Sequence, residues 1–275
     1  MRAGGRAADG AAVFPVLSRG EGGMAVAEAL EGPAGGRAPA ESVPARTQAD
    51  VSWLMLQQLL DSALPIGGFS HSFGLETMVQ EGRIRTASDL ERYAETMLLQ
   101  SWATLDAMIV KAVYECPPDD WERAWRIERF VHLQRAASES RAAAEKMGRR
   151  LLRLASDVYP GLDLGPLEEA YRSGRCLATH PLVFGFLCRR LGFPLHRAVQ
   201  GLIYGNLVTC VNSALRLMAI GQTAGQAIIA RLIPLIAEGW EIAKRLDPED
   251  AHACTPMAEL MAMRHETLYS RLFMS

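Results

Sequence analysis

From about residue 50 to its end, the chain consists of segments with the apolar periodicity of helices, separated by signals that typically begin helices. Prolines stand where the first turn of a helix accepts them, at Pro118, Pro166, Pro181, Pro248 and Pro256. No stretch shows the strict alternation or the Asn-Gly turns of β-hairpins. The pattern predicts an all-α, single-domain bundle of about ten helices, near residues 51–62, 72–82, 87–115, 118–134, 138–157, 166–173, 181–191, 195–218, 223–246 and 256–271.

Polar residues at several predicted helix starts support these boundaries. Asp247 and Thr255 each precede one of the prolines as an N-cap, because their side-chain oxygens can accept a hydrogen bond from a free N–H of the first turn. Two further segments resemble capping boxes, Thr86-x-x-Asp89 and Thr223-x-x-Gln226.

The N-terminal segment has a different composition from the rest of the chain. Of residues 1–48, 25 are Gly, Ala or Pro, and Phe14 is the single aromatic residue. Such a segment cannot bury enough apolar surface to offset its conformational entropy. We therefore expect residues 1–48 to be a disordered extension and residues 49–275 to form the helical domain.

Charge and cysteine usage limit the class of protein. A net charge of −2 over 275 residues argues against nucleic-acid binding, which requires a basic surface. The five cysteines form no C-x-x-C pair, a pattern that indicates free thiols in a reducing compartment. We find neither a membrane span nor the continuous apolar core of a signal peptide, and we expect a cytoplasmic protein.

The segment 195–218 is apolar around most of its circumference and should lie at the centre of the bundle. One polar stripe crosses it, formed by Asn206, Thr209, Ser213 and Arg216. The stripe is either a solvent-facing seam or a functional groove. Tyr204 lies beside it and could serve an interface, because a tyrosine combines apolar area with a polar tip.

The glycine-rich segment 64–76 fits none of the catalytic templates that it suggests. A phosphate-binding loop requires a Gly-Lys pair, which is absent from the whole sequence, and the G-x-S-x-G pattern of a nucleophile elbow is also missing. We expect instead a turn in which Phe69 and Phe73 pack while His71 faces outward.

Metal-ligand chemistry has only weak candidates. Cys176 and His180 form one close pair, His252 and Cys254 form another, and His71 stands alone. Neither pair completes the four-ligand set of a structural zinc site. Ordinary packing is the preferred interpretation, and no metal site is predicted.

The C-terminal residues 265–275 are rich in large side chains, although a chain terminus usually frays. Tyr269, Leu272 and Phe273 would expose apolar surface unless the tail docks, and Arg271 carries a charged fork suited to a carboxylate or a carbonyl. The tail is either a last helix folded onto the core or a segment that binds a partner.

Three segments in the expected order resemble the UreF family of urease accessory proteins. Residues 59–76 resemble the opening motif of that family, residues 221–226 its G-Q-T-x-G-Q element, and residues 265–275 its C-terminal signature. The resemblance extends over about residues 50–275.

The resemblance implies an all-α, dimeric accessory protein that takes part in inserting nickel into urease. Its partners would be UreD (called UreH in some species), the GTPase UreG and the urease apoprotein, and its tail would become ordered on binding UreD. GTP would be bound and hydrolysed by UreG, and nickel would be handled by the complex. The chain itself would be no enzyme and would hold no stably bound cofactor.

Several residues match family positions that are involved in complex formation. For the residues of the opening motif, the match does not decide which partner they face. The matching residues are Ser70, His71, Glu76, Tyr204, Tyr269, Arg271, Leu272 and Phe273.

Two other functions stay open on the sequence. The chain could carry nickel directly through the weak ligand pairs, or it could regulate a GTPase by contacting the nucleotide with an arginine. No single arginine in the sequence is distinguished for the second role.

Overall fold

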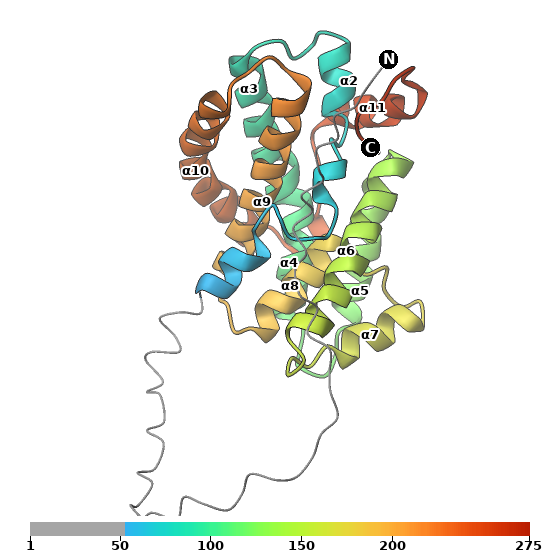
Figure 1. The fold of residues 1–275 in the computed structure, drawn as a ribbon. Helices are drawn as coiled ribbons and strands as arrows, with labels where there is room; N and C mark the ends of the chain where they lie inside the picture. The colour runs from blue at the N-terminus through green and yellow to red at the C-terminus, as the bar shows by residue number, and fades with distance from the viewer. Residues whose placement is uncertain (1–52) are drawn as a thin grey trace, which may run out of the picture. The chain divides into compact units, whose positions relative to one another are not determined.

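The computed structural model describes residues 53–275, and all regular secondary structure in this range is helical (Figure 1). The predicted all-α class is thereby confirmed. Within the described range, no helix combines the length and the apolar composition needed to span a membrane. The predicted extension over residues 1–48 lies outside the described residues.

The first helix covers residues 53–59, and short 3-10 turns (η1, η3, η4) and one π-helical segment (η2) lie among the longer helices. The further elements are η1 (Gly68–Ser70), α2 (Leu75–Gln80), α3 (Ala87–Met97), η2 (Leu98–Asp106), α4 (Ala107–Glu115), α5 (Glu122–Gln134), α6 (Ser138–Val158), α7 (Gly165–Arg172), α8 (His180–Arg190), α9 (Leu195–Leu217), α10 (Gln222–Arg245), η3 (Pro248–Asp250), α11 (Pro256–Arg264) and η4 (His265–Thr267).

The helix predicted over residues 118–134 begins late, at Glu122. Residues 118 and 119 form a turn instead, closed by a hydrogen bond from the Asp120 N–H to the main-chain oxygen of Pro117 at 3.3 Å. The carboxylate of Asp120 then accepts a hydrogen bond from the Glu122 N–H at 3.1 Å and caps the first turn. The other four prolines are placed as predicted, in the first turns of α7, α8, η3 and α11.

Two more predicted helices are too long. The helix predicted over residues 72–82 begins at Leu75, because Gly74 has a φ of 88°, in the left-handed region. The helix predicted over residues 256–271 ends at Arg264. Beyond it, main-chain N–H groups bond to a side chain of α2 rather than to carbonyls one turn back, as described below.

The predicted caps have mixed outcomes. Thr86 and Asp89 form the capping box at the start of α3. Thr223 does not cap, because α10 begins one residue earlier after Gly221 and includes Thr223 in its first turn. Thr255 occupies the N-cap position of α11, but its hydroxyl makes no hydrogen bond.

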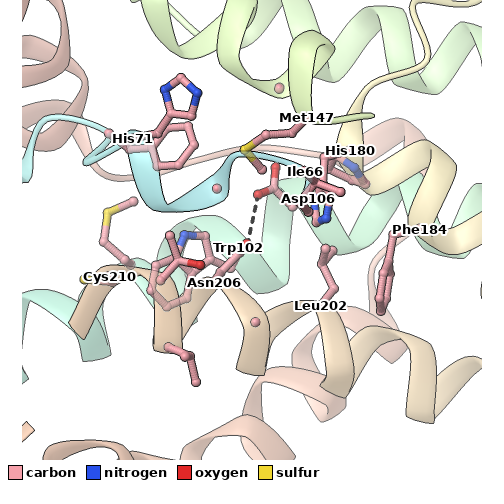
Figure 2. Close-up of a pocket in the computed structure, with 18 of the residues that line it drawn as sticks. Ile66, His71, Trp102, Asp106, Met147, His180, Phe184, Leu202, Asn206 and Cys210 are labelled. Atoms are coloured by element: carbon pink, nitrogen blue, oxygen red, sulfur yellow. Dashed lines mark hydrogen bonds between the residues drawn. The ribbon is translucent and has the colours of Figure 1, made fainter. Parts of the chain in front are cut away.

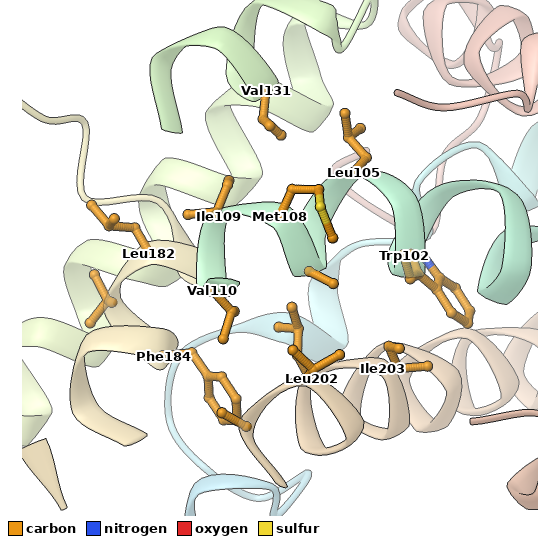
Figure 3. Close-up of a cluster of buried hydrophobic side chains, with 14 of the residues drawn as sticks. Trp102, Leu105, Met108, Ile109, Val110, Val131, Leu182, Phe184, Leu202 and Ile203 are labelled. Carbon is orange, nitrogen blue, oxygen red and sulfur yellow. The ribbon is translucent and has the colours of Figure 1, made fainter. Parts of the chain in front are cut away.

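The helices α4 and α9 form the centre of the described domain. All residues from Ala107 to Val113 in α4 are buried, and α9 packs against α4, α8 and α10, as predicted for the apolar segment 195–218. Figure 3 shows Val110 of α4 facing Phe184 of α8 and Leu202 of α9. The π-helical η2 joins α3 to α4 without a break, so the predicted helix 87–115 is continuous.

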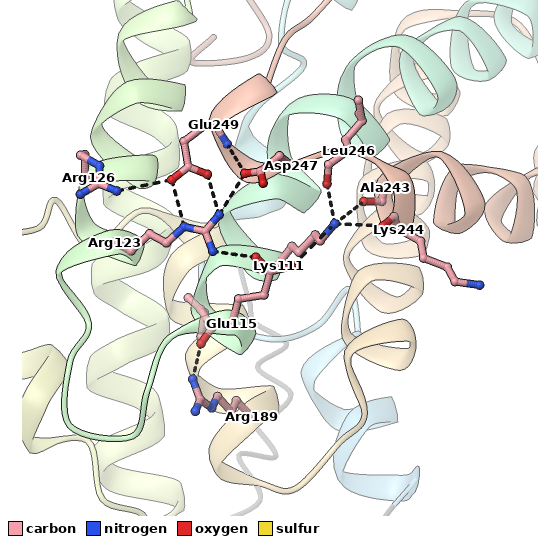
Figure 4. A network of polar contacts seen from close by, with 11 residues as sticks. Lys111, Glu115, Arg123, Arg126, Arg189, Ala243, Lys244, Leu246, Asp247 and Glu249 are labelled. Atoms are coloured by element: carbon pink, nitrogen blue, oxygen red, sulfur yellow. Dashed lines mark hydrogen bonds and ion pairs between the residues drawn. The ribbon is translucent and has the colours of Figure 1, made fainter.

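The centre of the domain also contains a buried lysine, whose ammonium group is satisfied by main-chain oxygens. The ammonium group of Lys111 donates to the main-chain oxygens of Ala243, Lys244 and Leu246 at the end of α10 (Figure 4). These carbonyls have no partner within the helix and carry the negative end of its dipole. Lys111 therefore ties α4 to the C-terminus of α10.

A half-buried arginine joins three elements beside this lysine. Arg123 of α5 pairs with Glu115 of α4 at 2.8 Å, with Asp247 at the N-cap of η3 at 2.9 Å, and with Glu249 of η3 at 2.6 Å (Figure 4). Single exposed pairs contribute little, but a shared guanidinium fixes the positions of its three partners relative to one another.

Gly148 sets the distance between α6 and the start of α8. A Cβ at this position would lie 2.0 Å from the main-chain oxygen of Ala178 and 2.6 Å from the main-chain nitrogen of His180. Only glycine allows the two backbones to approach so closely.

We predict that Gly148→Ala lowers the free energy of unfolding by about 3 kcal/mol or more, because the backbone of residues 178–180 must move. Replacing Gly by Ala within a helix usually raises the free energy of unfolding, because alanine has the higher helix propensity. A net decrease would therefore indicate the close approach of the two backbones. Chemical denaturation measures the effect. Gly161→Ala is the control, because a Cβ there meets nothing within 4 Å. Equal stability of the two variants would contradict the close approach.

Candidate functional site

The tail and the glycine-rich motif, separated by about 200 residues in sequence, lie side by side. The N–H of Met274 donates to the main-chain oxygen of Ser70 at 2.8 Å. The N–H groups of Ser72 and Phe73 both donate to the main-chain oxygen of Ser275, at 2.6 and 3.1 Å, and the Ser72 hydroxyl donates to the same oxygen. Main-chain groups therefore hold the end of the tail against the motif.

The backbone of the motif is unusual at this contact. Phe73 has a φ of 51° and the following Gly74 a φ of 88°, so two successive residues are left-handed. This conformation is unfavourable for an aromatic residue and persists only where its surroundings hold it. The contact with Ser275 is one such constraint.

Glu76 fixes the preceding part of the tail. Its carboxylate is almost fully buried and accepts the N–H groups of Leu272 and Phe273 at 2.7 and 3.0 Å, together with His265 Nε2 at 3.0 Å and Gln80 Nε2 at 3.2 Å. Burial alone would raise the pKa of Glu76, but the bonds from Leu272, His265 and Phe273 outweigh it and lower the pKa below its usual value. The tail is therefore tied to an ionised carboxylate.

His265 lies between two carboxylates. Its Nε2 contacts Glu76 at 3.0 Å, and its Nδ1 contacts Glu139 of α6 at 2.6 Å. Both ring nitrogens therefore face carboxylate oxygens, and His265 bridges α2 and α6. Arg271 pairs with the other oxygen of Glu139 at 2.6 Å.

The polar stripe of α9 contacts both the motif and the tail. The Ser213 hydroxyl donates to the main-chain oxygen of His71 at 3.2 Å, and Arg216 donates to that of Phe69 at 2.7 Å. The Arg216 guanidinium also lies 4.4 Å from the ring centroid of the buried Phe273, a cation–π distance. This part of the stripe is a contact face for the motif and the tail, not a solvent seam.

His71 is buried, and the prediction that it faces outward is wrong. The prediction that Phe69 packs is also wrong, because Phe69 is exposed. His71 is buried because the tail covers it and places the Ser275 hydroxyl 2.8 Å from its Nδ1. Burial first, and then the charges of Lys146 and Arg150, lower the pKa of His71 to about 4.

A pocket of about 170 Å³, lined mainly by apolar side chains with a few polar groups among them, lies beside the motif (Figure 2). Trp102 and Asp106 of η2, Asn206 of α9, and His180 of α8 line it, and Asn206 donates to Asp106 at 3.4 Å. Burial lowers the pKa of His180 to about 4. A pocket of this size has room for ordered waters next to its few polar groups.

The candidate metal ligands do not gather into a cluster. Among residues 53–275, no group of three or more His, Cys, Asp or Glu side chains is placed to hold a metal ion. His71 and His180 line the same pocket, whereas His252 and Cys254 are exposed. Burial raises the pKa of the Cys176 thiol to about 12, which disfavours the thiolate form that binds metals.

The outer surface of the docked tail is apolar. Tyr269 is fully exposed, and Leu272 and Met274 are each about half exposed, at 52% and 55%. The helix that leads into the tail, α11, also exposes three apolar side chains. We call the six residues the apolar tail face: Met257, Leu260, Met263, Tyr269, Leu272 and Met274. Such a group of large apolar side chains in solvent is typical of a protein-binding surface.

The structure brings together most of the residues predicted from the sequence. Ser70, His71, Glu76 and residues 271–273 all belong to the contact between motif and tail. Tyr204 does not, because it is half-buried against the core and no hydrogen bond in the described range links it to the tail. Sequence reasoning missed Glu139, whose role is visible only once α6 is placed next to the tail.

We predict that Glu76→Gln releases the tail, because a neutral amide cannot replace a carboxylate that accepts two N–H groups and also contacts the His265 ring. Hydrogen–deuterium exchange of residues 268–275 should become about tenfold faster or more, since bonds to a charged acceptor are lost. Exchange in α4 should stay slow. Glu238→Gln, at an exposed position on α10, is the control. Unchanged exchange in the tail would show that Glu76 does not hold it.

We also predict that acidification destabilises the domain through His71. Because the pKa of His71 lies near 4 in the folded state and a histidine in the unfolded chain has its ordinary pKa of 6.5, the unfolded state binds more protons between these values. Stability is then fully present above about pH 6.5 and is lost as the pH falls toward 4, by up to about 3 kcal/mol. In denaturation experiments at about pH 7 and about pH 5, His71→Asn should show a smaller decrease than the wild type. His252→Asn, at an exposed histidine, should keep the full decrease. Equal decreases in all three proteins would refute this assignment.

Comparison with known proteins agrees with the family that the sequence resembles. The UreF family model matches residues 84–233. Proteins described as urease accessory protein UreF from Paenarthrobacter aurescens (strain TC1), Lachnoclostridium phytofermentans and Actinobacillus pleuropneumoniae serotype 5b are 31%, 30% and 30% identical to this chain. The matches cover 81%, 81% and 80% of the chain and 97%, 98% and 97% of those proteins. The chain therefore belongs to the UreF family of urease accessory proteins.

Proposed function

We propose that this protein is a non-catalytic scaffold in urease maturation that bridges UreD (or UreH) and the GTPase UreG. The observation that carries the proposal is the arrangement of the tail. Its main chain and Phe273 are fixed on the motif, while Tyr269 and Leu272 point into solvent. Large aromatic and aliphatic side chains on a fixed backbone lose little entropy when a partner covers them.

The apolar tail face is the proposed contact for UreD. The second proposed contact, for UreG, is the adjacent surface formed by the exposed Phe69 and by Arg216. Arg216 touches both the motif and Phe273 of the tail. A partner that stabilises the docked tail therefore also stabilises the motif, and the two binding events are coupled.

The proposed assembly supplies the chemistry that this chain lacks. UreG would bind and hydrolyse GTP, and the complex would deliver nickel to the urease apoprotein. We propose that two copies of this chain are present in the assembly and that it acts in the cytoplasm, where its five free cysteines stay reduced. Direct carriage of nickel is the less favoured function, because the described residues offer isolated pairs of ligands.

We predict that Tyr269→Ala/Leu272→Ala weakens the complex with UreD by about tenfold to hundredfold, because two exposed anchor side chains are removed. The dissociation constant can be measured by isothermal titration, and the recovery of UreG by co-purification should fall in parallel. The stability of the isolated variant should not change, since neither side chain is buried.

Ile233→Ala on α10 is the matched control, because Ile233 is also half exposed, at 50%, and lies outside the apolar tail face. It should leave the dissociation constant unchanged. The scaffold proposal is wrong if the tail variant binds UreD and recovers UreG at the wild-type level.

A further inference from the structure

A second candidate surface is a groove between α6 and α7, with a volume of about 540 Å³. None of the residues of the apolar tail face lines it. Five cations line the groove: Lys146, Arg149, Arg150, Arg153 and Arg172. The first four lie on α6 and the last on α7.

The cations greatly outweigh the carboxylates of the groove. Asp157 and Glu168 are the two acidic residues in its lining, so the lining carries a net charge of +3, whereas the whole chain carries −2. Within residues 53–275, Lys146, Arg153 and Arg172 form no ion pair and no side-chain hydrogen bond. The groove thus gathers positive charge that the domain itself does not neutralise.

This arrangement is unfavourable for α6 alone. Lys146 and Arg150 are four residues apart on the helix, as are Arg149 and Arg153, and like charges at this spacing destabilise a helix. Glu145 relieves one of these repulsions by pairing with Arg149 at 2.9 Å. A ligand with several negative charges would relieve the others.

The spacing of the cations indicates the shape of that ligand. Along α6 they extend over residues 146–153, which is about 10 Å of helix axis. Next-nearest side chains of an extended peptide lie about 7 Å apart on one face, so a short run of carboxylates can reach successive cations. Arginine forks match carboxylates in geometry. A nucleic acid would require an extended basic surface, which a chain of net charge −2 does not offer.

We propose that the groove between α6 and α7 binds an acidic peptide segment, a run of Asp or Glu in extended conformation, from a protein partner. This site is separate from the apolar tail face and does not rest on the proposed contact with UreD. Tyr171 at the rim of the groove adds a partly apolar wall with a hydroxyl group, which suits a peptide.

The test is the binding of a fluorescent hexaglutamate peptide to the full chain, followed by anisotropy, with hexaglutamine as the neutral peptide. We expect saturable binding of hexaglutamate at low salt, loss of binding at about 1 M salt where the Debye length is about 3 Å, and no binding of hexaglutamine. Arg153→Gln/Arg172→Gln should weaken binding roughly tenfold. Both side chains are exposed, and within residues 53–275 neither forms an ion pair or a side-chain hydrogen bond. The variant should therefore fold normally.

Arg197→Gln/Arg245→Gln is the matched control, with the same loss of charge at exposed arginines outside the groove. It should bind hexaglutamate as the wild type does. Lys146→Gln is an independent second variant, with an expected loss of about threefold. The proposal is overturned if the wild type does not bind hexaglutamate, if the control weakens binding as much as the groove variant, or if a single-stranded oligonucleotide binds as tightly as the peptide.

Discussion

The buried carboxylate of Glu76 is the interaction on which the candidate site depends. It accepts two consecutive main-chain N–H groups of the tail and one ring nitrogen of His265, so it replaces the hydrogen bonds that a further helical turn would have made. Burying a charge is unfavourable unless donors surround it, and here the tail supplies most of them. The carboxylate and the docked tail therefore stabilise each other, because an undocked tail would leave the buried Glu76 without these hydrogen-bond donors.

The position of Glu76 follows from the fold. It is the second residue of α2, and α2 starts where it does because Gly74 is left-handed and lies against α11. A Cβ on Gly74 would come within 2.7 Å of the Ala262 main-chain nitrogen and 2.9 Å of the Ala258 main-chain oxygen. The same glycine thus ends the motif, directs Glu76 inward and brings α2 next to the helix that leads into the tail.

The sequence predicted the helices well and the site only in part, for physical reasons. Helical periodicity and first-turn prolines are local signals, and they located α3 to α11 except at the ends. The end of α11 was missed because the contacts that fix the residues after it, those of His265, Leu272 and Phe273 with Glu76, are made to a residue almost 200 positions away. The burial of His71 was missed for the same reason, since the tail that covers it is distant in sequence. Composition predicted that residues 265–275 must dock, but not that they would dock without a helix.

The way in which the tail is held also explains how it can present a surface. Main-chain N–H groups and the side chains of His265, Phe273 and Ser275 make most of the inward contacts. This leaves Tyr269, Leu272 and Met274 free to face outward. A helix in the same place would have directed every third or fourth side chain inward and satisfied its own N–H groups, so it would not have needed Glu76. Because the docking uses few buried apolar groups, it contributes a modest free energy. A partner that covers the outer face adds to that free energy, and by linkage the docked tail strengthens the binding of the partner by the same factor.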